Sequence, residues 1–246
     1  MSLPTVVSPK EWRAARVDLL ADEKALTRAR DELNTKRREL PMVKIEKDYV
    51  FDGPDGKFSL LDLFEGRRQL IVGHFMFDPS WDDGCPSCTA GADEMSKGHL
   101  DHLHARDTTF TYVSRAPLDK IESYKKRKGW TFPWYSSYGS DFNYDFHVTL
   151  DDSVTPAEYN FRTRAEHQLA GTPIDGDQPM ELPGRSSFLR VDDDVFHTFS
   201  IFARGLETMG GSYYLLDETA LGRQEDWEEP KDRAADARGA VPNFEK

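Results

Sequence analysis

The stretch Gln69-Leu-Ile-Val-Gly-His-Phe-Met-Phe77, followed after a short loop by Cys85-Pro-Ser-Cys88, is the part of the sequence that decides the fold class. The first segment is a nearly continuous apolar run of strand length, which is typical of a strand covered on both faces. We therefore expect it to be the central strand of a sheet. Pro86 suits the first turn of a helix, because the N–H group that proline lacks has no partner there. The sequence thus predicts a strand, a loop from Asp78 to Gly84, and one helix over residues 85–105.

The segments that follow continue this alternation. Residues 108–114 are typical of a second central strand, and residues 117–128 predict a helix that Gly129 can cap. Residues 186–191 and 195–199 then predict a β-hairpin around a turn of three aspartates. A β-α-β-α order indicates parallel strands joined by right-handed crossovers. We therefore expect an α/β fold with a central mixed sheet flanked by helices.

A long helix is predicted ahead of this domain, over residues 8–40. Ser8-Pro9-Lys10-Glu11 matches a capping box with proline in the first helical turn, and Pro41 ends the pattern. Apolar residues recur along the helix at a spacing of seven: Trp12, Leu19, Leu26, Leu33 and Leu40. The positions between them hold alanines and charges, so the pattern is half of a coiled-coil seam. Two interpretations stay open: the row packs on its own domain, or it joins two copies in a homodimer.

The sequence divides into three predicted parts. Residues 1–42 form the helical arm, and residues 43–222 form the α/β domain. Within that domain, residues 147–182 have weak periodicity with scattered Pro, Gly and Asp, which predicts a loop-rich insertion before the final hairpin. Residues 223–246 are charged and poor in apolar side chains, and we expect them to form a C-terminal tail.

Composition limits the classes of partner and compartment. The 246-residue chain has a net charge of −12, which disfavours nucleic acid and anionic membranes, because both attract basic surfaces. No stretch approaches the roughly 18 apolar residues of a membrane-spanning helix, and the N-terminus lacks a signal-peptide pattern. We therefore expect a cytoplasmic protein. Its two cysteines cannot provide a disulfide framework, so in a reducing compartment they indicate redox work or metal binding.

The redox interpretation assigns different roles to the two cysteines. Cys85 lies at the predicted helix N-terminus, where free N–H groups and the helix dipole favour a thiolate. Cys88 follows one turn later, close enough to form a disulfide with Cys85. We therefore predict Cys85 as the attacking thiolate and Cys88 as the resolving thiol, with no cofactor. Asp82 and Asp83 would raise the pKa of the thiols if they lie nearby.

A zinc site is the alternative for the same cysteines. Three histidines follow them, in a pattern similar to zinc sites: His99, His102 and His104. If residues 85–105 form one helix, His99 lies about 16 Å along the axis from Cys88, too far for one ion to bind both. We therefore predict no metal, unless that helix breaks. His74, inside the central strand, is interpreted as a core histidine rather than a catalytic base.

The order of these elements resembles thioredoxin. Longer segments are similar to a bacterial thioredoxin-like family catalogued as domain of unknown function 899: residues 75–88, 114–118, 129–134, 139–146 and 195–205. The resemblance covers residues 8–223 and implies a thioredoxin-like fold. It implies no substrate, because the family has none established.

Departures from better understood relatives suggest substrate-binding residues. Thioredoxins carry Trp before the first cysteine, whereas here Gly84 precedes it and Trp81 lies four positions upstream. The resemblance places Ser186 near the position of the thioredoxin cis-proline. Compared with peroxiredoxins, Asp82 takes the place of a peroxide-binding threonine, and Arg185 matches a later arginine. Trp134 belongs to an aromatic segment that either lines a groove or fills the core. The predicted set is therefore Trp81, Asp82, Trp134, Arg185 and Ser186.

Three functions follow from these residues. The first is thiol-disulfide oxidoreduction, with a protein or small thiol or disulfide as the substrate. The second is a peroxiredoxin-like peroxide reductase that passes through a sulfenic acid, although a carboxylate at the position of Asp82 disfavours it. The third is a redox-inert binding protein that has kept the thioredoxin-like fold.

Overall fold

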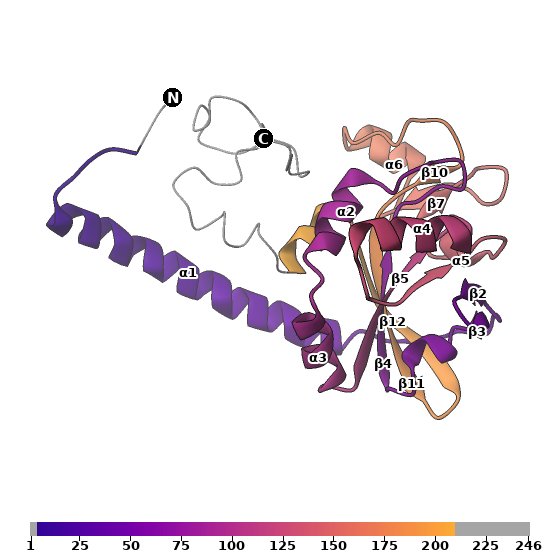
Figure 1. Cartoon of the computed structure of the whole chain (residues 1–246). Coiled ribbons are helices and arrows are strands. Elements are labelled where there is room, and N and C mark those ends of the chain that lie inside the picture. The colour runs from indigo at the N-terminus through magenta and orange to yellow at the C-terminus, as the bar shows by residue number, and fades with distance from the viewer. Residues whose placement is uncertain (1–3, 210–246) are drawn as a thin grey trace. The chain divides into compact units, whose positions relative to one another are not determined.

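The computed structural model of the protein describes residues 4–209 (Figure 1). This part of the chain divides into two compact units, residues 4–41 and residues 42–209. The first unit contains helix α1 and the second contains an α/β domain. None of the helices in the described range is long and apolar enough to cross a membrane. The predicted tail, residues 223–246, lies outside the described residues.

Helix α1 spans Pro9–Arg38 and begins at the predicted capping box. The Ser8 side chain accepts from the Glu11 backbone N–H, and the Glu11 carboxylate accepts from the Ser8 backbone N–H at 2.9 Å. No residue of α1 is buried. The apolar row at a spacing of seven is exposed along its whole length. Packing of this row on its own domain or across a homodimer stays a prediction.

The domain is built on one sheet of eight strands in the order β1-β12-β11-β4-β5-β6-β2-β3. The strands are β1 Val43–Lys44, β2 Val50–Gly53, β3 Gly56–Ser59, β4 Gln69–His74, β5 Thr108–Ser114, β6 Trp134–Ser136, β11 Gly184–Val191 and β12 Asp194–Phe202. β4, β5 and β6 are parallel, while β11 pairs antiparallel with both β4 and β12. The sheet is therefore mixed, as predicted, with β4 at its centre.

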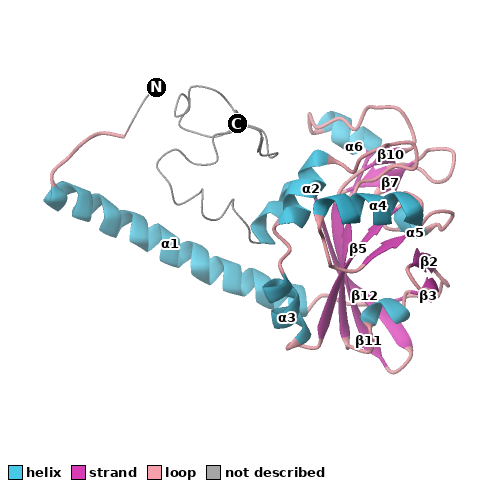
Figure 2. Cartoon of the chain, viewed as in Figure 1, coloured by secondary structure: helices cyan, strands magenta, loops and turns pink. Residues whose placement is uncertain are grey.

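Helices surround the sheet, whose strands run through the middle of the domain (Figure 2). They are α2 Pro86–Asp93, α3 Lys97–His104, α4 Leu118–Lys128, α5 Phe142–Asp145, α6 Arg164–Leu169 and the short 3-10 helices η1 Asp62–Phe64 and η2 Ala203–Met209. α2 and α3 connect β4 to β5, and α4 connects β5 to β6. The hairpin β11–β12 returns beside β4. This connectivity is the predicted thioredoxin-like arrangement.

Two predicted elements have different boundaries in the structure. The helix expected over residues 85–105 is two helices, because Ser96 caps a new one by accepting from the His99 backbone N–H at 3.3 Å. The central strand ends at His74 rather than Phe77. Phe75 still donates its backbone N–H to Val113, at 3.0 Å. Beyond it the chain turns into the loop that carries Asp78.

The insertion before the final hairpin contains short regular elements besides loops. Four two-residue strands lie there in two antiparallel pairs, together with α6: β7 Thr149–Leu150, β8 Glu158–Tyr159, β9 Arg162–Thr163 and β10 Met180–Glu181. Thr163 caps α6 in a second capping box with Glu166. Two-residue strands give almost no periodic signal, which is why the sequence pattern predicts only loops here.

The apolar run of the central strand contributes to two buried clusters. Leu70 and Val72 belong to a cluster that includes Phe142, Phe146 and Phe188. Phe75, just beyond the end of β4, lies in a second cluster with Phe77, Ala92, Ile121, Tyr124, Phe132 and Trp134, and Cys88 packs against it. Burial of this run in both clusters accounts for the apolar pattern that identified the strand.

Candidate active site

Cys85 and Cys88 lie at the start of α2. Cys85 is the N-cap residue, and Pro86 is the first residue of the helix. The backbone N–H of Cys85 donates to the Met76 carbonyl at 2.9 Å, which ties the start of α2 to the segment that follows β4. Both cysteines are free thiols in the structure. The strand-to-helix junction predicted from the sequence is therefore present.

Gly84 occupies the position before the first cysteine because no side chain fits there. A Cβ atom built on Gly84 would lie 2.5 Å from the ring of Phe75 and 3.3 Å from the ring of Tyr124. Phe75 and Tyr124 both belong to the second core cluster. The close approach of this backbone to the core explains why this chain has glycine here.

The two thiols differ in acidity. The pKa of Cys85 is lowered to about 6, first by the hydrogen bond from the Cys88 thiol and then, against an opposing effect of burial, by the backbone N–H groups of Cys88 and Ser87. The pKa of Cys88 is raised, because its thiol donates to Cys85 and because it is buried. At neutral pH this arrangement gives a Cys85 thiolate beside a protonated Cys88.

The two aspartates of the preceding loop do not set these acidities. Asp83 forms an ion pair with Arg127 of α4, and Asp82 is exposed. The groups that shift the pKa of Cys85 are Cys88 and Ser87, together with its own burial. The pKa increase that the sequence suggested for the thiols is therefore not found at Cys85.

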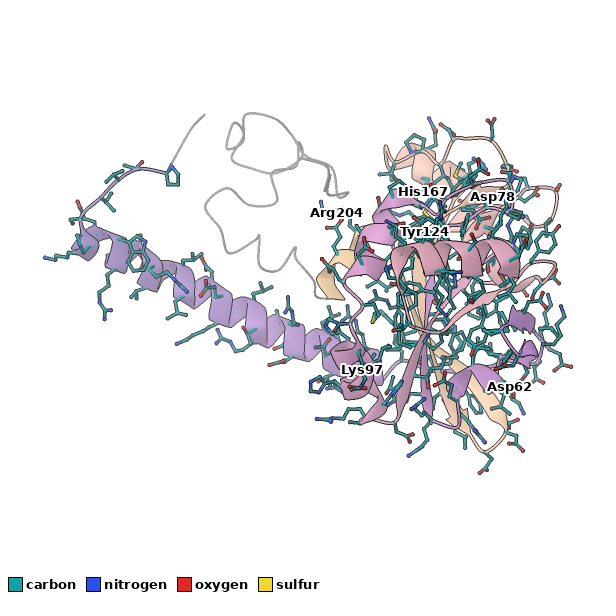
Figure 3. The ribbon with its side chains drawn as sticks, viewed as in Figure 1. Asp62, Asp78, Lys97, Tyr124, His167 and Arg204 are labelled. Carbon is teal, nitrogen blue, oxygen red and sulfur yellow. The ribbon has the colours of Figure 1, made fainter. Side chains whose placement is uncertain are left out.

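An ion-pair network fixes the beginning of the loop. Asp78, labelled in Figure 3, pairs with Arg115, which lies between β5 and α4. Arg115 also donates its Nε to Glu181 of β10 at 2.7 Å, and Glu181 accepts from Thr149 at 3.0 Å. Burial raises the pKa of Glu181, and Arg115 acts against that increase. This network joins the insertion to the loop that leads to Cys85.

Three of the predicted substrate-binding residues are at least partly accessible. Trp81 and Asp82 are exposed on the loop next to the cysteines. Arg185 is partly buried in β11 and pairs in register with Gly73 of β4. Burial lowers the pKa of Arg185, and Tyr112 acts against that decrease. Binding by these three residues stays a prediction.

The prediction is corrected for Trp134 and Ser186, which are core residues. Trp134 is 1% exposed, and its Nε1 donates to Ser114 at 2.9 Å. Ser186 is fully buried and lies 2.8 Å from His74 Nε2. Successive strand residues point to opposite faces of a sheet, so Ser186 and Arg185 face different ways. Neither Trp134 nor Ser186 can line an open groove.

Ser186 belongs to a polar chain that crosses β4, β11 and β12. Its Oγ lies 2.8 Å from Ser200 Oγ, which lies 2.8 Å from His197 Nε2. His74 Nδ1 is buried without a hydrogen-bond partner among the described residues. An unmatched N–H costs more than an unmatched lone pair, so we assign the proton of His74 to Nε2. Each side chain then donates to the next: His74 donates to Ser186, Ser186 to Ser200, and Ser200 to His197.

The zinc alternative gains no support from the broken helix. No group of three or more His, Cys, Asp or Glu side chains that could hold a metal ion occurs in the described part of the chain. His99 instead lies in the first turn of α3, where its backbone N–H is bonded to Ser96.

Comparison with known families identifies the chain. The sequence matches the family model described as "Bacterial protein of unknown function (DUF899)" over residues 1–238. The chain belongs to this family. The resemblance of the sequence segments to this DUF899 family is thereby confirmed.

The chain also matches solved structures, at low sequence identity and low TM-score. The peroxidoxin BcpB of Mycobacterium tuberculosis is 13% identical, covers 69% of this chain and 92% of its own, and has a TM-score of 0.39. A mutant PrxQ of Xylella fastidiosa is 14% identical, with 65% and 84% covered and a TM-score of 0.38. A proposed protein disulfide isomerase from Bacteroides thetaiotaomicron is 16% identical, with 69% and 88% covered and a TM-score of 0.39. No curated protein matches this DUF899 member.

Proposed function

We propose that this DUF899 member is a thiol-disulfide oxidoreductase. The observation that carries the proposal is the placement of two free thiols one turn apart at the start of α2, with Cys85 partly exposed and Cys88 more deeply buried. An accessible thiolate beside a protected thiol is the arrangement that disulfide exchange requires.

The reaction follows from these positions. The Cys85 thiolate attacks one sulfur of a substrate disulfide, forms a mixed disulfide and releases the other substrate sulfur as a thiolate. Cys88 then loses its proton and attacks the Cys85 sulfur. This step closes the Cys85–Cys88 disulfide and releases the second substrate thiol. Two electrons pass from the protein to the substrate, and the proton of Cys88 passes to a released substrate thiolate. Two external thiol groups, which leave joined as a disulfide, return the protein to its dithiol form.

The substrate class is a disulfide or thiol of a protein or small molecule. Trp81 and Asp82 are the exposed side chains on the loop just before Cys85, so they are our candidates for contact with the substrate. Arg185 is a third candidate, because a partly buried cation on the sheet would favour an acidic substrate group.

A trapping experiment tests the proposal. A Cys88→Ser variant mixed with glutathione disulfide should accumulate a stable mixed disulfide on Cys85, because the resolving thiol is absent. Mass spectrometry locates the adduct. Cys85→Ser is the control and should form far less adduct at pH 7, because the remaining Cys88 thiol is less accessible and its burial still raises its pKa. In the wild-type protein, alkylation of Cys85 should have its midpoint near pH 6, in line with its lowered pKa of about 6.

Two outcomes separate the proposal from its alternatives. If Cys88→Ser forms no adduct and wild-type Cys85 alkylates only slowly at pH 7, the protein is not an oxidoreductase of this kind. If hydrogen peroxide instead converts Cys85 to a sulfenic acid far faster than glutathione disulfide reacts, the peroxide reductase function replaces it.

A further inference from the structure

Helix α4 contacts the cysteine loop and α2 through one face. Lys120, Tyr124 and Arg127 lie at spacings of four and three, which places them on the same side of a helix. Lys120 Nζ donates to the carbonyls of Pro79 and Trp81 at 2.8 Å each. Arg127 pairs with Asp83. These contacts hold the loop, whereas Tyr124 contacts α2 itself.

Tyr124 reaches the backbone of Cys85 through one intermediate side chain. The Thr89 hydroxyl donates to the Cys85 carbonyl at 2.9 Å and lies 2.8 Å from the Tyr124 hydroxyl. A hydroxyl has only one proton, so the proton of the second bond comes from Tyr124. The chain therefore donates from Tyr124 to Thr89 and from Thr89 to the carbonyl of Cys85.

Both side chains that form these hydrogen bonds are buried. Thr89 is 6% exposed and Tyr124 is also 6% exposed. The Tyr124 ring packs 5.6 Å from the Phe77 ring and 5.6 Å from the Trp130 ring. By contrast, the Arg127 and Asp83 side chains are each more than half exposed, and an exposed ion pair contributes little. The ion pair of Arg127 joins α4 only to the loop, whereas the buried hydroxyl pair of Tyr124 and Thr89 joins α4 to α2 itself.

We propose that Tyr124 is a positioning residue for Cys85: through Thr89 it holds the first turn of α2 so that the backbone N–H groups of Ser87 and Cys88 face the Cys85 sulfur. The inference rests on the proposed function of Cys85 as the attacking thiolate. Tyr124 touches neither the sulfur nor the substrate. It acts by keeping the carbonyl of Cys85, and hence the turn that follows, in one orientation.

The test removes single hydroxyl groups and follows the pH profile of Cys85 alkylation by iodoacetamide, read by mass spectrometry on the full chain. Tyr124→Phe keeps the ring, and Thr89→Val keeps the shape of threonine. We expect each to raise the midpoint by about half to one pH unit, which slows alkylation at pH 5 by about threefold to tenfold. Thr89→Ser retains a hydroxyl and should restore most of the wild-type profile.

A matched control separates positioning from loss of stability. Tyr49→Phe also removes the hydroxyl of a core tyrosine. Tyr49 belongs to the other core cluster, and its hydroxyl donates to Asp145 at 2.8 Å in a partly buried hydrogen bond. Tyr49→Phe should lower the melting temperature and leave the alkylation midpoint unchanged. The inference is overturned if Tyr124→Phe likewise lowers only the melting temperature. A different result would contradict the proposed function alone: the variants shift the alkylation midpoint as expected, but wild-type Cys85 does not exchange with glutathione disulfide.

Discussion

Cys85 and Cys88 carry the same side chain, and their places on α2 give them opposite tendencies to ionise. Cys85 lies just before the helix, where the N–H groups of the first turn have no partner within the helix. Cys88 lies inside that turn and packs against the core. The difference in acidity therefore comes first from the hydrogen bond that the Cys88 thiol donates to Cys85, and then from the backbone N–H groups near Cys85 and the burial of Cys88.

Gly84 provides a prediction at the same scale. Gly84→Ala would place a methyl group against the Phe75 ring, so we expect a loss of about 1–3 kcal/mol in the free energy of unfolding. Urea denaturation measures it. Gly91→Ala in α2 is the control, because a Cβ atom added there would have nothing within 4 Å and alanine favours a helix. Equal stability of the Gly84→Ala and wild-type proteins would contradict the close packing.

At the scale of elements, the polar chain across β4, β11 and β12 links three strands through side chains. Burial and the charge of His197 lower the pKa of His74 to about 3. Apart from Ser186, the His74 ring lies next to two aromatic side chains, Phe142 of α5 and Phe146. Burial also lowers the pKa of His197. The folded protein therefore keeps His74 and His197 neutral at pH values where the same histidines are protonated in the unfolded protein.

A histidine whose folded pKa is below its unfolded value contributes stability above about pH 6.5, and this is lost as pH falls toward 3. From pH 7 to pH 5 we expect His74 alone to cost about 2 kcal/mol of unfolding free energy. Urea denaturation of wild type and His74→Gln at both pH values measures it. An identical pH dependence in the two proteins would show that His74 does not titrate in this way.

At the scale of the whole molecule, Arg115 connects three distant parts of the domain. It pairs with Asp78 of the cysteine loop and with Glu181 of the insertion, and it follows β5. Arg115→Met would leave two carboxylates without their cation, which we expect to cost about 3–5 kcal/mol. Chemical denaturation at pH 7 measures this loss.

The pH dependence of that variant is a second readout. Without Arg115, burial raises the pKa of Glu181 further above its unfolded value, so Glu181 costs stability as the pH rises through the unfolded pKa. The defect of Arg115→Met should therefore shrink as the pH falls from 7 to 5. Glu181→Gln in the same background should lessen the defect at pH 7. A defect that is constant with pH would contradict this account.

The sequence predicted the central part of the fold well and the insertion poorly. The residues of β5 and α4 match the predicted segments closely, because a buried strand and a capped helix leave strong periodic signals. The break between α2 and α3 depends on one capping serine, Ser96, within an otherwise helical pattern. β7 to β10 are too short to leave any pattern.

The residues of the candidate site were likewise predicted only in part. The sequence predicted Cys85 and Cys88 at a helix start, because their spacing and Pro86 are local features. It missed Thr89, Tyr124 and Arg115, whose contacts join segments that are far apart along the chain. No signal in a single sequence could have singled them out. The sequence left open whether Trp134 lines a groove or fills the core, because an aromatic segment looks the same whether its rings face a substrate or the core.

The sequence by itself determined the α/β class, the central strand and the cysteine pair at a helix start, because each depends on neighbours in the chain. The helix start also predicted Cys85 as the more acidic thiol. Only the tertiary structure decided which groups lower the pKa of Cys85, why glycine precedes it and which side chains hold it. Those properties depend on burial and on hydrogen bonds between α2, α4 and the segment after β4, which form when distant segments pack together. The same packing placed Ser186 and Trp134 inside the domain and left Trp81 exposed beside Cys85.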